Sequence, residues 1–137
     1  MRLSTRGQYG VRALVQLAAN YDKGPMPLRE ISKNENISYQ YLEQIFLDLK
    51  KNELVRSVRG ARGGYSLARD PNKITVGDII RSLEGPIGPV DCVKEEDSKS
   101  CERSSICVSR NVWKKLRDRM TEVLDEFTLK DLTESYE

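Results

Sequence analysis

The order of local patterns between residues 27 and 68 restricts the fold more than any other feature of this sequence. Pro27 opens a short segment with helical periodicity, LREISK, and the turn NENI separates it from a second one, YQYLEQIFLDLKKN. Ser38 directly precedes the second segment and is a favourable helix N-cap. The apolar residues there follow the spacing of one helix face: Leu42, Ile45, Phe46 and Leu49. Two short helices joined by a tight turn predict a helix-turn-helix.

The next segment changes from the period of a helix to that of a strand. LVRSV alternates apolar and polar residues, RGARGG is a glycine-rich basic turn, and YSLA continues as a second strand. A β-hairpin directly after a helix-turn-helix predicts a winged helix. The rest of the sequence predicts four more helices: residues 7–21 capped by Ser4 or Thr5, 76–85 capped by Thr75, 109–127, and 129–136 capped by Thr128 with Asp131.

The predicted fold class is mainly α with a small β-wing: a winged helix-turn-helix DNA-binding domain followed by a long C-terminal dimerisation helix. GPIGP interrupts regular structure and divides the chain. We expect the DNA-binding domain over residues 1–84, a hinge and cysteine-bearing loop over 85–108, and a dimerisation helix with a C-terminal segment over 109–137. A long amphipathic helix outside the main core favours a homodimer, because helix-turn-helix proteins usually read two half-sites as symmetric dimers.

Composition excludes several classes of function. The chain of 137 residues contains no histidine. Serine-protease triads, the HExxH zinc motif and imidazole acid–base catalysis are therefore impossible, and no glycine loop fits a phosphate site. We expect no enzyme and no catalytic residues. The N-terminus lacks the apolar core of a signal peptide, and no apolar run approaches about 18 residues, which predicts a cytoplasmic protein with no membrane partner.

Charge is divided unevenly along the chain. Residues 1–65 hold eleven Lys and Arg against six Asp and Glu, a net charge of +5, whereas residues 66–137 hold twelve against fifteen, a net charge of −3. A basic front half on a nearly neutral chain suggests a polyanion bound by one face. Together with the predicted winged helix, this favours double-stranded DNA as the partner, at a palindromic or pseudo-palindromic site.

The second helix of the helix-turn-helix and the wing supply the candidate DNA contacts. Glutamine bonds adenine, glutamate accepts from cytosine, and hydroxyl groups near a helix start suit phosphate oxygens. Arginine beside glycine suits a narrow minor groove. The candidate DNA-binding residues are Ser38, Tyr39, Gln40, Tyr41, Glu43, Gln44, Arg56, Arg59, Gly60, Arg62, Gly63, Gly64 and Tyr65.

All cysteines of the chain lie in one polar segment, as Cys92, Cys101 and Cys107. In a reducing compartment, clustered thiols indicate metal or redox chemistry rather than a structural disulfide. A zinc site normally uses paired CxxC motifs, whereas gaps of eight and five residues suit a larger inorganic core held by thiolates. The residues alone leave zinc, an iron–sulfur cluster and a thiol switch open.

Three stretches of the chain resemble the IscR-like family of bacterial winged-helix regulators: MRLSTRGQYGVRAL, ISYQYLEQIFLDLKKNELVRSVRGARGGYSL and ITVGDIIRSLEGPIGPVD. The resemblance covers nearly the whole chain and implies a dimer joined by a long C-terminal helix. It implies that Glu43 and Gln44 read bases and that Arg59 enters the minor groove. The branch with three cysteines binds an iron–sulfur cluster and senses iron–sulfur status or nitric oxide. A cysteine-less branch, the CymR type, represses cysteine-metabolism genes.

By this resemblance the three cysteines ligate an iron–sulfur cluster, with [2Fe–2S] favoured over [4Fe–4S]. At the positions where the family carries a fourth ligand, the residues of this chain depart from the family pattern. Regulators of iron–sulfur biogenesis usually place a histidine three residues after the third cysteine, where this chain has Arg110. Nitric oxide sensors use a carboxylate near residue 8, where this chain has Gln8. The carboxylate candidates are Glu95, Glu96, Asp97 and Glu43, of which Glu43 would read a base when no cluster is bound.

The resemblance therefore predicts a regulator whose promoter choice is controlled by its cluster and which controls iron–sulfur biogenesis genes. One alternative is a nitric oxide-sensing [4Fe–4S] repressor. The other is a cluster-free thiol-switch or cysteine-metabolism repressor.

Overall fold

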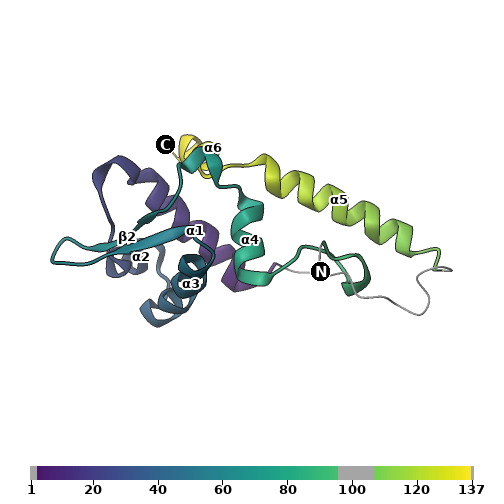
Figure 1. Cartoon of the computed structure of the whole chain (residues 1–137), viewed down its shortest axis with the longest axis horizontal. Helices are drawn as coiled ribbons and strands as arrows, with labels where there is room; N and C mark the ends of the chain where they lie inside the picture. Colours follow the sequence, from purple (N-terminus) through teal and green to yellow (C-terminus); the bar gives the residue numbers. More distant parts are fainter. Residues whose placement is uncertain (1–2, 96–106, 137) are drawn as a thin grey trace.

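A computed structural model of the chain describes residues 3–95 and 107–136. Its elements are α1 Thr5–Ala19, the 3₁₀ turn η1 Tyr21–Lys23, α2 Leu28–Glu35, α3 Tyr39–Lys51, β1 Val55–Val58, β2 Gly64–Leu67, η2 Pro71–Lys73, α4 Val76–Glu84, η3 Asp91–Val93, α5 Arg110–Glu126 and α6 Leu129–Tyr136. The winged helix forms one end of the molecule, and α5 reaches away from it (Figure 1). The predicted class, mainly helical with a two-stranded wing, is confirmed.

Side chains cap four helices as predicted: Ser4 on α1, Ser38 on α3, Thr75 on α4 and Thr128 on α6. Two of these caps are reciprocal. The carboxylate of Asp78 accepts the N–H of Thr75, and the carboxylate of Asp131 accepts the N–H of Thr128. These hydrogen bonds satisfy backbone groups that a helix start leaves unpaired, so they fix where each helix begins.

The core forms where α1, α3, α4 and the wing meet. The predicted apolar stripe of α3 is completely buried: Leu42, Ile45, Phe46 and Leu49 each have 0% exposure. The ring of Phe46 also packs against Tyr65 of the wing, with the ring centroids 4.8 Å apart. The helix-turn-helix and the wing therefore share one core, which fixes the base of the wing relative to α3.

The wing is an antiparallel pair whose register places Val55 opposite Leu67. Met26, just before α2, pairs with Tyr65 through two backbone hydrogen bonds of 2.9 Å. Gly64 beside it has φ +148°, and a Cβ at this position would lie 2.3 Å from the carbonyl oxygen of Met26. Glycine is therefore required at residue 64 for the wing to lie against the chain that leads into α2.

The C-terminal helix α6 packs against α1 and η2. Leu129 at its start is fully buried in the winged-helix core. The chain between α5 and α6 pairs with the chain before α4: the N–H of Val76 donates to the oxygen of Phe127, and the N–H of Leu129 donates to the oxygen of Ile74, both at 2.9 Å. The chain thus returns to the winged helix after α5. In the part that the structure describes, no helix is both long and apolar enough to cross a membrane.

Candidate DNA-binding surface and cysteine site

The side of α3 opposite its buried stripe presents the predicted base-reading residues to solvent. Gln40, Glu43 and Gln44 are exposed. Tyr39 and Leu47, on the same helix, expose 43% and 57% of their surface. A recognition helix needs polar donors and acceptors on the side that enters the major groove. This face of α3 is therefore the candidate reading surface.

Two of the predicted phosphate contacts also have structural roles. The hydroxyl of Ser38 accepts the N–H of Tyr41 at 3.3 Å, as the cap of α3 requires. Tyr41 is half-buried, and its ring meets that of Tyr9 edge-on with a centroid separation of 5.6 Å. A phosphate contact from either residue stays a prediction.

The wing carries three exposed arginines, Arg56, Arg59 and Arg62. The turn between its strands depends on glycine. Gly60 has φ +109°, and a Cβ at Gly63 would lie 2.2 Å from the oxygen of Val58. The glycines that we expected to approach a groove are therefore needed first to form the turn that presents the arginines. Exposed arginines on such a tip suit insertion into a minor groove.

Glu43 lies beside the base of the wing. It lines a recess of about 280 Å³ between α3 and β2, together with Tyr39, Leu47 and Tyr65. Burial, and next the negative charge of Glu43, raises the pKa of the Tyr65 phenol. A predicted base reader and a predicted wing contact therefore belong to one continuous surface.

Cys92 lies in η3, within a loop that follows α4 and closes on itself. The N–H of Ile87 donates to the carboxylate of Glu95 at 2.9 Å, and the N–H of Glu95 donates to the oxygen of Ile87 at 3.1 Å. Val93 is fully buried, and Cys92 beside it is half-buried. Residues 87–95 are referred to below as the Cys92 loop. Its closure limits where the Cys92 thiol can lie.

Arg110, the first residue of α5, connects two of the cysteines through their main chains. Its guanidinium donates to the oxygen of Cys92 at 3.3 Å, and its own N–H donates to the oxygen of Cys107 at 3.3 Å. Two turns further along α5, Arg117 donates to the oxygen of Val93 at 3.1 Å. Since a guanidinium has no electron pair to offer a metal, these arginines hold the main chain at Cys92 and Val93 and do not ligate.

Cys101, Glu96 and Asp97 lie outside the described residues. Among the residues that are described, no three cysteine or carboxylate side chains converge on a point where a metal ion could sit. The ligand set predicted from the sequence therefore stays a prediction.

Glu95, one of the candidate fourth ligands, is held by another group. Arg81 donates to its two carboxylate oxygens at 2.9 and 3.0 Å. Burial acts to raise the pKa of Glu95, but the hydrogen bonds from Arg81 and from the Ile87 N–H outweigh it, so the pKa lies below its ordinary value. A ligand role for Glu95 would require it to leave Arg81.

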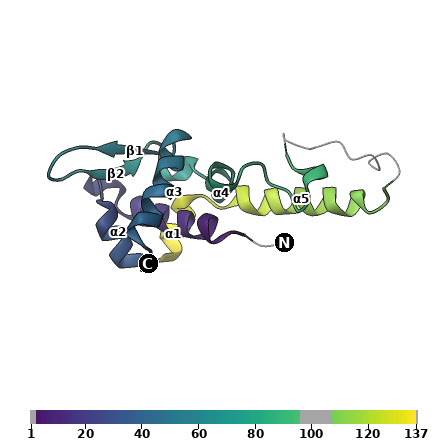
Figure 2. The ribbon, with the colours of Figure 1, turned by 90° about the horizontal axis from the view of Figure 1, so that it is seen from below.

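Glu43, the other described candidate for the fourth ligand, lies on a different part of the molecule. It is on α3 in the winged helix, whereas the Cys92 loop lies beyond α4, alongside α5 (Figure 2). Within a single chain, Glu43 and the Cys92 loop therefore lie on separate elements. Its role as a cluster ligand stays a prediction.

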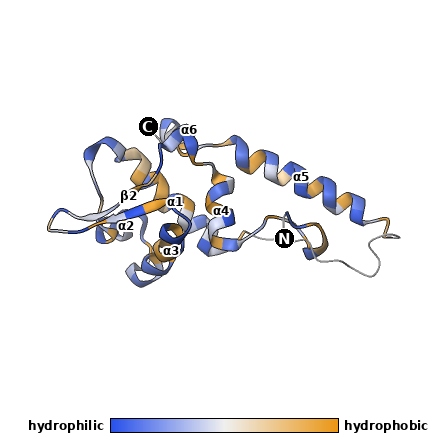
Figure 3. Cartoon of the chain, viewed as in Figure 1, coloured by the Kyte–Doolittle hydropathy of each residue, from blue (hydrophilic) through white to orange (hydrophobic). Residues whose placement is uncertain are grey.

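None of the 17 residues of α5 is buried. Val112 and Val123 on α5, and Phe127 directly after it, expose 58%, 53% and 45% of their surface. Hydrophobic and hydrophilic residues alternate along the helix (Figure 3). Apolar side chains of this size, exposed along one helix, are typical of a surface that another chain covers.

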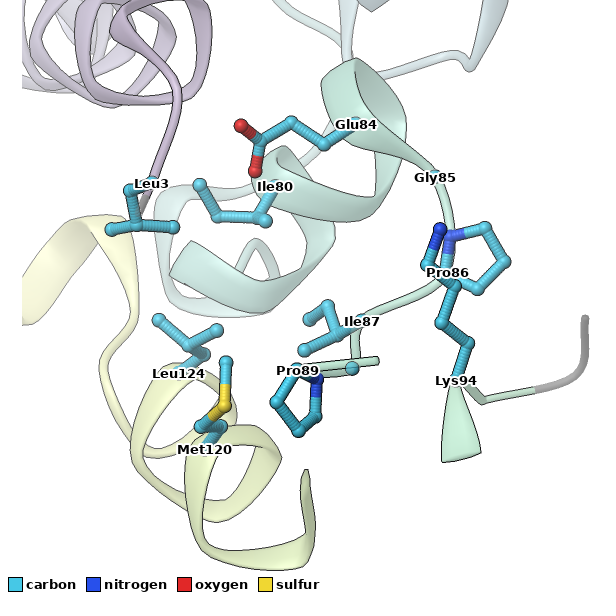
Figure 4. A pocket seen from close by; sticks show the side chains of 11 residues that line it. Leu3, Ile80, Glu84, Gly85, Pro86, Ile87, Pro89, Lys94, Met120 and Leu124 are labelled. Atoms are coloured by element: carbon cyan, nitrogen blue, oxygen red, sulfur yellow. The ribbon is translucent and has the colours of Figure 1, made fainter. Parts of the chain in front are cut away.

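A recess of about 390 Å³ separates α5 from α4. Met120 and Leu124 of α5 lie on one side of it, and Ile80 of α4 and Ile87 of the Cys92 loop lie on the other (Figure 4). Apolar packing between the two helices is therefore incomplete within one chain. Polar contacts consequently carry more of the attachment of α5 to α4.

A helix with an exposed polar face, followed by an arginine-bearing wing, defines a winged-helix DNA-binding protein. The model of the Rrf2 family, described as iron-dependent transcriptional regulators, matches residues 3–135. The chain belongs to this family and is a transcriptional regulator.

Among its relatives, the HTH-type transcriptional regulator CymR of Bacillus subtilis is 43% identical over 132 residues, which cover 96% of this chain and 89% of the relative. The HTH-type transcriptional regulator IscR of Pectobacterium atrosepticum is 39% identical over 137 residues, 100% of this chain and 82% of the relative. The solved structure of T. potens IscR is 42% identical, with a TM-score of 0.82, and the match covers 100% of this chain and 89% of that one.

These names are consistent with the expectation that the chain is no enzyme, because both are transcriptional regulators. The two names occur at similar identity, so overall similarity does not decide between the branches.

Proposed function

We propose that DNA binding by this regulator is controlled by chemistry at Cys92, Cys101 and Cys107, most simply a bound iron–sulfur cluster. The main observation in support is that Arg110 bonds the main chains of both Cys92 and Cys107, beside a winged helix. Thiolates are the ligands that hold iron–sulfur clusters, and the guanidinium of Arg110 places a positive charge near that anionic group. The donor chemistry therefore fits.

When bound, such a cluster supplies an inorganic centre whose loss or modification reports the state of the cell. We favour [2Fe–2S] over [4Fe–4S], and iron–sulfur biogenesis genes as the targets. The protein's own residues recognise the DNA. The polar face of α3 reads the major groove, and Arg59 enters the minor groove.

The regulator acts as a homodimer on a palindromic or pseudo-palindromic site in this proposal. Val112 and Val123 of α5, together with Phe127 directly after the helix, supply the exposed apolar surface for the second copy. Two winged helices joined by their α5 helices would meet successive half-sites on one face of the DNA.

The 43% identity to CymR favours a second candidate function. In it, the chain represses cysteine-metabolism genes without a cluster, and its thiols act as a switch. A nitric oxide-sensing [4Fe–4S] repressor is the alternative within the cluster-binding branch.

Visible absorption of the protein purified without oxygen separates these functions. We expect bands between about 320 and 600 nm, from charge transfer in a cysteine-bound cluster. Iron and sulfide analysis should then give about two of each per chain for [2Fe–2S] and about four for [4Fe–4S]. The variant Cys101→Ala should lose the colour but keep its helical circular dichroism.

Ser105→Ala, a change in the same segment, is the matched control and should keep the colour. A protein that stays colourless after anaerobic reconstitution with iron and sulfide would refute cluster control and favour the thiol switch. A fully coloured Cys101→Ala would show that Cys101 is no ligand.

A further inference from the structure

Arg81, in the last turn of α4, contacts carboxylates from three segments of the chain. Besides its two hydrogen bonds to Glu95, it donates to both oxygens of Asp125 on α5, at 2.8 and 2.7 Å. Asp78, one turn earlier on α4, lies 3.8 Å from the same guanidinium. A planar guanidinium can bind two carboxylates in two-pronged fashion, which an ammonium group cannot do. One side chain thus joins α4, the Cys92 loop and α5.

The contact between Arg81 and Glu95 lies where the two ends of the Cys92 loop meet. The carboxylate that Arg81 holds also accepts the N–H of Ile87, and this pair closes the loop. A displacement of Cys92 that opens the loop therefore has to move Glu95, which is one of the carboxylates bonded to Arg81.

The contact with Asp125 is placed where α5 meets the winged helix. Asp125 also accepts the hydroxyl of Thr75, the cap of α4, at 3.2 Å. A Cβ on Gly77 would lie 2.0 Å from an oxygen of Asp125, so glycine leaves the space in which that carboxylate sits. Because α5 has no buried residue and a recess separates it from α4, this polar contact has a large share in fixing the two helices.

We propose that Arg81 is the positioning residue that couples the Cys92 loop to α5, so that a change at the cysteines alters how α5 lies on the winged helix. This inference rests on the proposed function, in which the cysteines are the sensing site. It specifies the route of the signal, which runs from the Cys92 loop through Glu95, Arg81 and Asp125 to α5. In a dimer held by α5, a shift of that helix against α4 changes the spacing of the two reading helices.

The first test uses hydrogen exchange of the full-length chain and needs no DNA. The variants are Arg81→Gln, Glu95→Gln and Asp125→Asn, and Glu122→Gln is the control because it removes a carboxylate from an exposed position on α5. We expect the backbone amide of residue 95 to exchange about tenfold faster in each variant and to stay within about twofold of wild type in the control. Unchanged exchange in Arg81→Gln would overturn the positioning role, and unchanged exchange in Asp125→Asn would overturn the coupling to α5.

The second test measures DNA affinity before and after the thiols are alkylated with iodoacetamide, on a fragment that the wild-type protein selects from a random pool. We expect alkylation to change the wild-type Kd by about tenfold or more. In Glu95→Gln and Asp125→Asn the ratio of the Kd after alkylation to the Kd before it should fall to within about twofold of one.

The two ideas fail in different ways. If alkylation changes the Kd of Glu95→Gln and Asp125→Asn as much as it changes that of wild type, the role of Arg81 is overturned and the proposed function stays in place. A wild-type protein whose Kd does not respond to alkylation, nor to a reconstituted cluster, would overturn the proposed function. Hydrogen exchange would then decide the positioning role by itself.

Discussion

Replacing Leu129 by alanine tests whether α6 belongs to the winged-helix core. Leu129 has no exposed surface and lies in the same cluster as the buried residues of α1 and α3. Removing a fully buried leucine side chain typically costs about 2–5 kcal/mol, because transfer energy is lost and a cavity remains. We expect a loss of about 3 kcal/mol in the free energy of unfolding. With a urea dependence of about 1.5 kcal/mol per molar, the midpoint falls by about 2 M.

The assay is urea unfolding followed by circular dichroism, at one protein concentration because dimer stability depends on concentration. Leu132→Ala is the matched control: it makes the same change in the same helix at a half-buried position. We expect it to cost about 1 kcal/mol, in proportion to the smaller area buried. Equal shifts for Leu129→Ala and Leu132→Ala would refute the reasoning, because α6 would then not be anchored by a buried leucine.

Three further outcomes follow from the same contacts. Arg59→Ala should weaken DNA binding and lower the salt dependence of log K by about one unit, as measured by anisotropy over a KCl series; an unchanged slope would remove Arg59 from the interface. The hydrogen bonds of Arg81 lower the pKa of Asp125 and, against burial, that of Glu95, so this stabilisation is complete above the unfolded pKa values, about 4, and is lost as pH falls below them. Urea midpoints from about pH 6 to 3 should therefore fall more steeply in wild type than in Arg81→Gln. Arg110→His should slow the loss of cluster absorbance in air, since imidazole can ligate; an unchanged rate would place residue 110 out of reach of the iron.

Sequence reasoning succeeded where the determinants are local. Ser38 and the stripe that follows it lie within four turns of one helix, and the cap at Thr75 depends on a residue three positions away. The wing was equally predictable from the sequence, because the alternation of apolar and polar residues marks its strands and the glycines around Gly60 mark its turn. These features need no knowledge of distant segments, which is why the structure reproduces them.

Contacts between segments far apart in the sequence could not be predicted from it. The partners of Arg81 lie 14 and 44 residues further along the chain, and only its spacing of three from Asp78 was visible locally. Leu129 was assigned to the C-terminal segment by its position, since an apolar residue at a helix start does not show which surface it will meet. Gly64 was read as a groove contact, whereas its neighbour Met26 provides the steric reason for it.

Arg110 shows how one substitution can change the role of a position. At residue 110, where the resemblance implies a histidine, the arginine side chain donates to the oxygen of Cys92, and within the described residues its buried Nε has no hydrogen-bond partner. In the proposed cluster-bound state, the positive charge of Arg110 would stand near the anionic group without occupying a coordination position. If the proposed cluster is bound, its fourth ligand would be an oxygen donor, which binds iron less firmly than a thiolate does. The residue that holds the main chain at Cys92 would thereby keep a bound cluster labile, which is the property that a sensor requires.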